Sequence, residues 1–215
     1  MKIPYGISDF ELLRSNQYLF VDKTEYLKVL ESFSERYIFF LRPRRFGKSL
    51  LISMMDHYYD RNKAENFEKL FKGLTIYENP TPLRNSYYIL RFNFSGINTQ
   101  TQDLLIEGFG HEVKMAIQDF INRYGLESEI QQDATGMPSD RLRSFLTQVR
   151  YRLAGKIYVL IDEYDHFAND LLSLKTDLFE DTISKAGFVR KFYEVLKGGT
   201  ESIIDRIFAT GVIHV

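Results

Sequence analysis

The stretch YIFFLRPRRFGKSLLI, at residues 37–52, decides the fold of this chain. It begins with an apolar run at 37–41, passes through a turn rich in arginine, and continues into a segment whose apolar residues recur at helical spacing. We predict a buried strand, a loop and an amphipathic helix, in that order. Unpaired N–H groups and the positive end of the helix dipole gather where a helix begins, so this arrangement can bind a phosphate.

Three consecutive residues of the loop suit that chemistry. Gly47 lets the backbone approach phosphates closely, Lys48 can reach the β- and γ-phosphates, and Ser49 offers a hydroxyl to Mg²⁺. The pattern G-x-x-x-x-G-K-[ST] places its first glycine where this chain has Arg42. We therefore expect Arg42 to adopt a backbone conformation open to non-glycine residues, helped by the fixed φ of Pro43.

The loop also carries two further cations, Arg44 and Arg45. A guanidinium group donates strong hydrogen bonds to phosphate oxygens, so both arginines are candidate phosphate contacts. The alternative is a basic turn that is merely solvated.

A second motif, KIYVLIDEYD, lies at residues 156–165. It is an apolar strand followed by carboxylates, as in the Walker B segment of NTPases. Asp162 would hold Mg²⁺ and Glu163 would orient and activate the attacking water. Carboxylates after strands also serve as helix caps, which is an alternative for Asp165. Thr210 ends another apolar run, where its hydroxyl is a candidate γ-phosphate sensor or water-positioning group; a threonine that only ends a strand is the competing interpretation.

The wider pattern predicts an α/β protein with a mostly parallel sheet of about four to five strands, sandwiched by helices. Strands are expected at 37–41, 87–94, 157–161 and 203–209, and helical spacing marks 50–58, 104–121, 142–153 and 188–196. Gly198 and Gly199 suit a left-handed stop for the last helix. We predict a single domain over residues 1–215, with a helical insertion at about 101–154 that is a candidate subdomain.

Composition excludes several classes of protein. The chain has 215 residues, 44% of them hydrophobic, so it can bury a core. Its net charge of −1 argues against strong intrinsic binding of nucleic acid or an anionic membrane. Cysteine is missing from the sequence, which excludes disulfides and thiolate metal sites, and the four histidines lack metal-ligand spacing. We predict a soluble, cytoplasmic protein without membrane contact.

With these residues placed, the sequence resembles the predicted AAA-ATPase-like family of bacterial P-loop proteins, related to archaeal and STAND ATPases. The resemblance covers nearly the whole chain and rests on residues 4–10, 20–24, 42–49, 160–165 and 210–212. It implies an additional-strand P-loop fold with the catalytic strand inserted beside the loop strand, and ATP with Mg²⁺ as ligands. The catalytic residues would be Lys48, Glu163 and Thr210, and the metal ligands Ser49 and Asp162. The nucleotide-binding residues would be Arg44, Arg45, Phe46, Gly47, Lys48, Ser49, Leu50 and, near the adenine, Asp22.

The resemblance also sets expectations about partners. Relatives commonly carry a PD-(D/E)xK nuclease-like domain after the ATPase. We expect this chain to stop before the last strand and lid of the ATPase. Nucleic acid would then be a partner only through such a nuclease-like domain. A protein partner or a second copy is also possible. The leading function is Mg²⁺-dependent ATP hydrolysis that drives a conformational switch; the alternatives are a nucleotide-gated interaction module with little turnover, a part of a nucleic-acid-processing system, and a small-molecule phosphotransferase. Candidate arginine fingers are Arg141, Arg143, Arg150, Arg152, Arg190 and Arg206.

Overall fold

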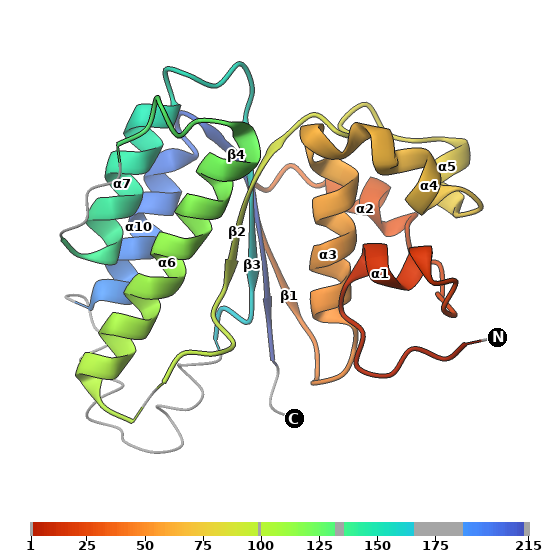
Figure 1. Ribbon diagram of the computed structural model, residues 1–215, viewed down its shortest axis with the longest axis horizontal. Helices are drawn as coiled ribbons and strands as arrows, with labels where there is room; N and C mark the ends of the chain where they lie inside the picture. Colours follow the sequence, from red (N-terminus) through yellow and green to blue (C-terminus); the bar gives the residue numbers. More distant parts are fainter. Residues whose placement is uncertain (1, 99, 132–135, 166–186, 213–215) are drawn as a thin grey trace.

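The computed structural model describes residues 2–98, 100–131, 136–165 and 187–212. Four parallel strands form one sheet in the order β1-β4-β3-β2 (Figure 1). The strands are β1 (Tyr37–Leu41), β2 (Tyr88–Asn93), β3 (Ile157–Asp162) and β4 (Ile204–Gly211). The four predicted strands are therefore confirmed, with ends that shift by at most two residues.

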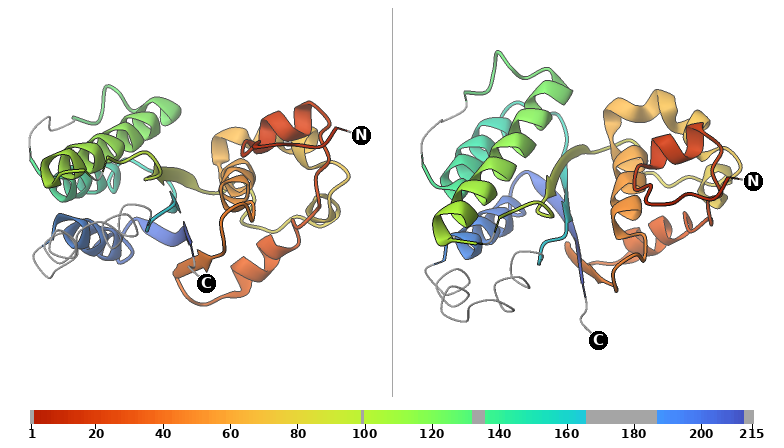
Figure 2. Two further views of the ribbon diagram at one scale, coloured as in Figure 1. Left: turned by 90° about the horizontal axis from the view of Figure 1, so that it is seen from below. Right: turned by 60° about the horizontal axis from the view of Figure 1, so that its bottom comes forward.

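Helices cover the sheet in two layers, one on each face (Figure 2). The first layer contains α1 (Phe10–Ser15), α2 (Tyr26–Ser32), α3 (Lys48–Tyr59), the 3-10 helix η1 (Arg61–Asn66), α4 (Phe67–Phe71) and α5 (Thr75–Glu78). The second contains α6 (Gln102–Tyr124), α7 (Pro138–Val149) and α10 (Phe188–Gly199). Helices α6 and α7 occupy the part of the chain where we predict an insertion. Helix α6 packs on β2 and on α7, α7 packs on α10, and both share one hydrophobic core with the sheet.

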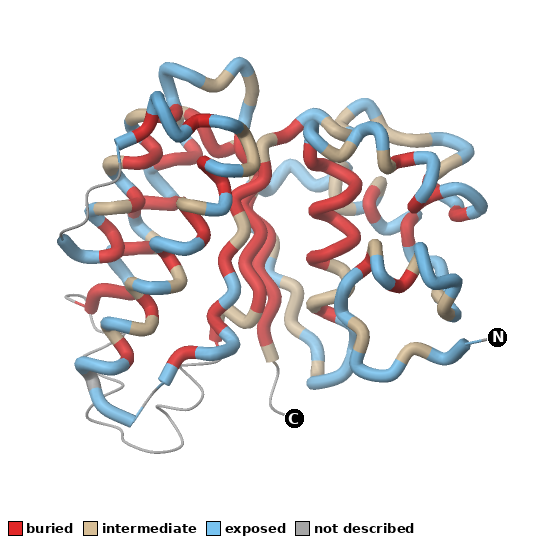
Figure 3. Tube along the Cα trace, in the orientation of Figure 1, coloured by how far each residue is buried: buried red, intermediate tan, exposed pale blue. Residues whose placement is uncertain are grey.

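The core lies where the sheet meets each helical layer (Figure 3). Strand β3 is buried along its whole length, as its unbroken apolar run predicts. Strand β1 differs, because it lies at the sheet edge and Phe39 is 55% exposed. The end of β1 nevertheless remains fixed, since the amide of Arg42 donates to the carbonyl of Gly211 on β4 at 3.2 Å.

Capping residues set the two ends of α6, whereas the predicted end of α10 is corrected by the structure. Helix α6 begins where the hydroxyl of Thr101 accepts from the amide of Leu104, and it ends at Gly125, whose φ is +65°. The left-handed stop expected at Gly198 and Gly199 is wrong, because both lie inside α10 without positive φ. Gly199 serves close packing instead: a Cβ there would lie 2.6 Å from the side chain of Ile204.

Candidate functional site

The loop at residues 42–47 joins β1 to α3 and contains two left-handed residues. Gly47 has φ +75° and Arg45 has φ +67°. A Cβ at Gly47 would have open space around it, so the backbone angle is what favours glycine there. Arg42 is not among the positive-φ residues, which confirms that the position of the first glycine can hold arginine in this loop. The left-handed Arg45 gave no signal in the sequence.

Lys48 begins α3 and turns its amine back into the loop. Its Nζ donates to the carbonyl oxygen of Arg42 at 3.2 Å and to that of Pro43 at 3.0 Å, and the residue is only 6% exposed. Ser49 and Leu50 are half-buried beside it, whereas Arg44, Arg45 and Phe46 are exposed. The ammonium group of Lys48 is therefore buried against the backbone carbonyl groups of the loop, whereas Arg44 and Arg45 are exposed to solvent.

The carboxyl end of β3 is fixed by a side chain of β4. The hydroxyl of Thr210 donates to Oδ1 of Asp162 at 2.6 Å and accepts from the amide of Glu163 at 3.2 Å. Thr210 is fully buried and Asp162 is 2% exposed. The structure thus places the hydroxyl of Thr210 on Asp162, where it sets the orientation of the carboxylate.

Glu163 follows β3 in a left-handed conformation, with φ +53°. Such a backbone is uncommon for a residue with a side chain, and strain of this kind gathers at functional sites. It is held by the bond from the amide of Glu163 to Thr210 and by the amide of Tyr164, which donates to the carbonyl of Thr210 at 2.9 Å. Asp165 accepts the amide of Val212 at 2.9 Å, so it joins the ends of β3 and β4.

The loop and the two motif strands converge at one end of the sheet. Because all strands are parallel, the ends of β1, β4 and β3 lie side by side near the beginning of α3 (Figure 1). The strand inserted beside β1 is β4, which carries Thr210, and the Asp162 strand lies one position further. Two strand spacings, or about 10 Å, separate the end of β1 from the end of β3. The segments that carry Lys48 and Asp162 thus lie at the same end of the sheet, although the sequence separates the two residues by more than a hundred positions.

Asp22, the residue expected near the adenine, and Asn93, at the end of β2, have different surroundings. Asp22 accepts hydrogen bonds from the amide and hydroxyl of Thr75, at 2.6 and 2.7 Å, and from Thr24, and it thereby caps α5. Partial burial raises the pKa of Asp22, but these hydrogen bonds outweigh that effect and the pKa lies below its ordinary value. Asn93, paired in register with Asp162, accepts the amide of Ser95 in a local turn.

Sequence reasoning missed a buried charged cluster behind α3. Asp56 is 3% exposed and lies 2.9 Å from Arg123, 3.1 Å from Lys63 and 3.9 Å from Arg91. Burial alone would raise the pKa of Asp56, but Lys63 and Arg123 lower it below its ordinary value. Since these residues come from α3, η1, α6 and β2, the cluster ties the loop helix to the far edge of the sheet. No local pattern in the sequence could signal contacts over such separations.

Comparison with known proteins gives the family. A family model described as "Predicted AAA-ATPase" matches residues 4–215. The chain belongs to the predicted AAA-ATPase family. A protein of Azotobacter chroococcum mcd 1, described as an uncharacterized protein in the vnfD 5' region, is 31% identical over 166 residues, which are 76% of this chain and 29% of that protein. No solved structure matches significantly.

The chain therefore spans under a third of the length of this relative. Within the residues that the structure describes, no helix is long and apolar enough to cross a membrane. His166, directly after the β3 motif, lies outside the described residues, so its surroundings are not assigned. No group of three or more histidine or acidic side chains in the described ranges could by itself hold a metal ion.

Proposed function

We propose that this member of the predicted AAA-ATPase family binds ATP with Mg²⁺ at the joined ends of β1, β4 and β3 and hydrolyses it. The observation that carries the proposal is the hydrogen bond from Thr210 to Asp162, which presents a buried, oriented carboxylate two strands from the loop that holds Lys48. A cation loop and an oriented carboxylate are the complementary halves of a site for a nucleotide and its metal.

The residues present fit these ligands. Lys48 already donates to two loop carbonyls, and phosphate oxygens offer its amine stronger, charged acceptors at the same loop. Arg44 and Arg45 are exposed and can turn toward the same anion. Ser49 and Asp162 supply the hydroxyl and carboxylate oxygens that Mg²⁺ prefers, with water and phosphate oxygens completing such a shell. When bound, Mg²⁺ would neutralise phosphate charge and orient the phosphate oxygens.

Glu163 supplies the base. Its left-handed backbone turns the residue out of line with the strand while the bond to Thr210 holds its amide in place. A carboxylate carried on a backbone fixed in this way can orient a water molecule and accept its proton during attack on the γ-phosphate. Thr210 acts through Asp162 and the amide of Glu163, so it is a positioning residue rather than one that contacts the nucleotide.

The experiment separates binding from turnover. Lys48→Ala should abolish ATP binding, measured by calorimetry with Mg²⁺, whereas Glu163→Gln should bind ATP and lose phosphate release. The exposed residues Lys72 and Glu201 provide matched controls, Lys72→Ala and Glu201→Gln, which should behave as the wild-type chain does. Unchanged turnover in either site variant would refute the assignment. ATP binding without phosphate release in the wild-type chain would favour a nucleotide-gated module instead, and a conformational switch would then depend on binding alone.

A further inference from the structure

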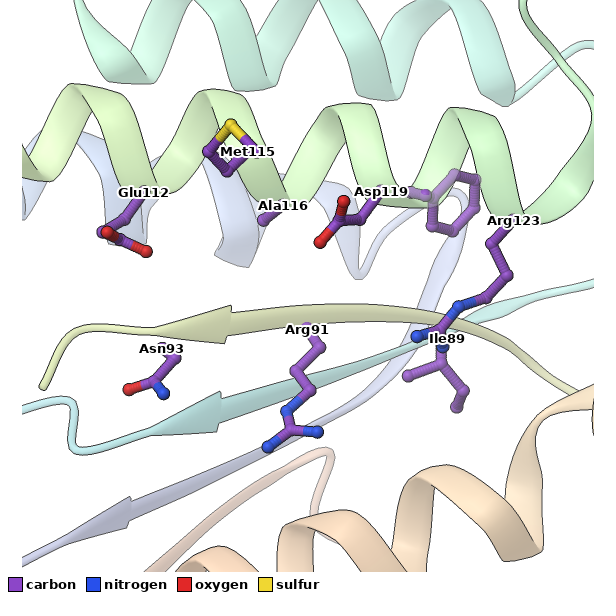
Figure 4. Close-up of a pocket in the computed structure, with 9 residues that line it drawn as sticks. Ile89, Arg91, Asn93, Glu112, Met115, Ala116, Asp119 and Arg123 are labelled. Carbon is purple, nitrogen blue, oxygen red and sulfur yellow. The ribbon is translucent and has the colours of Figure 1, made fainter. Parts of the chain in front are cut away.

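A cavity in the described part of the chain is lined by residues that the proposed nucleotide site does not use. It is about 250 Å³ and lies between the outer edge of β2 and one face of α6 (Figure 4). From the strand it is lined by Ile89, Arg91 and Asn93. From the helix it is lined by Glu112, Met115 and Asp119, among others. We call this space the β2–α6 groove.

The edge of β2 is open along the groove. Since Tyr88 and Phe94 donate their amides toward β3, the alternation of a strand turns the N–H and C=O groups of Ile89, Arg91 and Asn93 outward. The amide of Ile89 is already satisfied, because it donates to the hydroxyl of Tyr124 at 2.7 Å. Within the described residues, the amides of Arg91 and Asn93 have no hydrogen-bond partner. An open row of this kind is a template for another strand.

The charges that remain available in the groove are negative. Arg123 lies 2.9 Å from Asp56 and 3.2 Å from Asp60, and Arg91 lies 3.9 Å from Asp56, which also pairs with Lys63, so both guanidinium groups already have a carboxylate partner behind the groove. Glu112 and Asp119 instead point into the space between helix and strand (Figure 4). Neither makes an ion pair or hydrogen bond with the described residues. Free carboxylates disfavour nucleic acid and favour a basic ligand.

The spacing of these groups fits an extended polypeptide. Glu112 and Asp119 are seven residues apart on α6, or about 10 Å along the helix. Met115, which is 42% exposed, lies between them. In an extended strand, residues i, i+2 and i+4 share a face and span about 13 Å, a distance that flexible lysine or arginine side chains easily match. A basic–x–apolar–x–basic segment would therefore set its charges on the carboxylates and its apolar side chain on Met115.

We propose that the β2–α6 groove binds an extended basic segment of a partner protein, which adds to the sheet as a strand beside β2. Backbone hydrogen bonds to Arg91 and Asn93 would supply affinity, and Glu112 and Asp119 would select positive side chains. The proposal does not use the residues of the nucleotide site, because none of these four groove residues belongs to the proposed catalytic or binding set, although Asn93 is paired in register with Asp162.

The probe is a capped five-residue peptide of lysine, threonine, valine, threonine and lysine, tested with the whole 215-residue chain. Titration should give saturable binding, and the same peptide with glutamate in place of lysine should not bind. Amide hydrogen exchange should show new protection at Arg91 and Asn93, with Ile89 unchanged. Side-chain capture alone would not protect these two amides, so binding without that protection overturns strand addition.

Charge reversal in the groove completes the test. Glu112→Lys with Asp119→Lys should weaken peptide binding by about tenfold or more, as expected when two attractive pairs become repulsive. Asp103→Lys with Glu107→Lys makes the same change of charge at exposed positions of α6 outside the groove and should leave binding unchanged. Equal loss in both pairs, or no binding by the wild-type chain, overturns the proposal. So does a dimer that protects Arg91 and Asn93 without peptide, because a second copy would then be the occupant.

Discussion

The hydroxyl of Thr210 is the most informative single group to remove. Thr210→Val keeps the shape of the side chain but deletes its donor to Asp162 and its acceptor for the amide of Glu163. A hydrogen bond to a charged group contributes about 1.5–3 kcal/mol, and a buried amide left unpaired costs about 1–3 kcal/mol. The two effects overlap because they share one oxygen. We expect a loss of about 2–4 kcal/mol in the free energy of unfolding.

The assay is urea unfolding followed by far-UV circular dichroism at pH 7. In a thermal melt of a chain of this size, the same loss of stability lowers the melting temperature by about 5–15 °C. Thr210→Ser keeps the hydroxyl and should recover most of the stability, whereas the control Thr147→Val changes an exposed helix residue and should stay within about 0.5 kcal/mol of wild type. If Thr210→Val is as stable as Thr147→Val, the hydroxyl does not hold the end of β3, and the argument for an oriented Asp162 fails.

Two further predictions concern packing and pH. Gly199→Ala should lower the free energy of unfolding by about 1–3 kcal/mol, because the new Cβ would lie 2.6 Å from Ile204. The adjacent Gly198→Ala has open space and should stabilise α10 by about 0.5–1 kcal/mol. Equal urea midpoints for the two variants would contradict the close contact. Burial, reinforced by Lys63, lowers the pKa of His57 from 6.5 to about 4, so the unfolded chain takes up a proton first as pH falls. Stability is then full above pH 6.5 and declines toward pH 4, and His57→Gln should flatten that slope in urea titrations at stepped pH.

The sequence predicted the strands well because each is a dense apolar run between breakers, and burial in a parallel sheet demands little else. Long helices such as α6 were also predictable, since many turns repeat the same apolar spacing. The short helices α1, α2, α4 and α5 were not predicted, because one or two turns give too few repeats for a period. Their ends depend on distant partners, as when the amide of Phe10 donates to the hydroxyl of Ser53 at 2.9 Å.

At the candidate site, sequence reasoning identified residue types but not their relations. The triplet at 47–49 and the carboxylates at 162–163 carry recognisable chemistry wherever they fold. The sequence could not show that Asp22 would cap α5, because that depends on where Thr75 lies in space. Nor could it show the left-handed backbone of Arg45 and Glu163, since neither residue type favours that conformation.

The Thr210-Gly211 pair explains how β4 holds the chain that follows β3. A Cβ at Gly211 would lie 2.4 Å from the ring of Tyr164 and 2.8 Å from Oδ1 of Asp165, so only glycine lets the chain after β3 pass this close to β4. That approach is what allows the amide of Tyr164 to reach the carbonyl of Thr210. Both residues therefore hold the chain after β3 close to β4: Thr210 does so through its hydroxyl, and Gly211 because it has no side chain. Together they hold Asp162 and the chain that follows β3 against the end of β4.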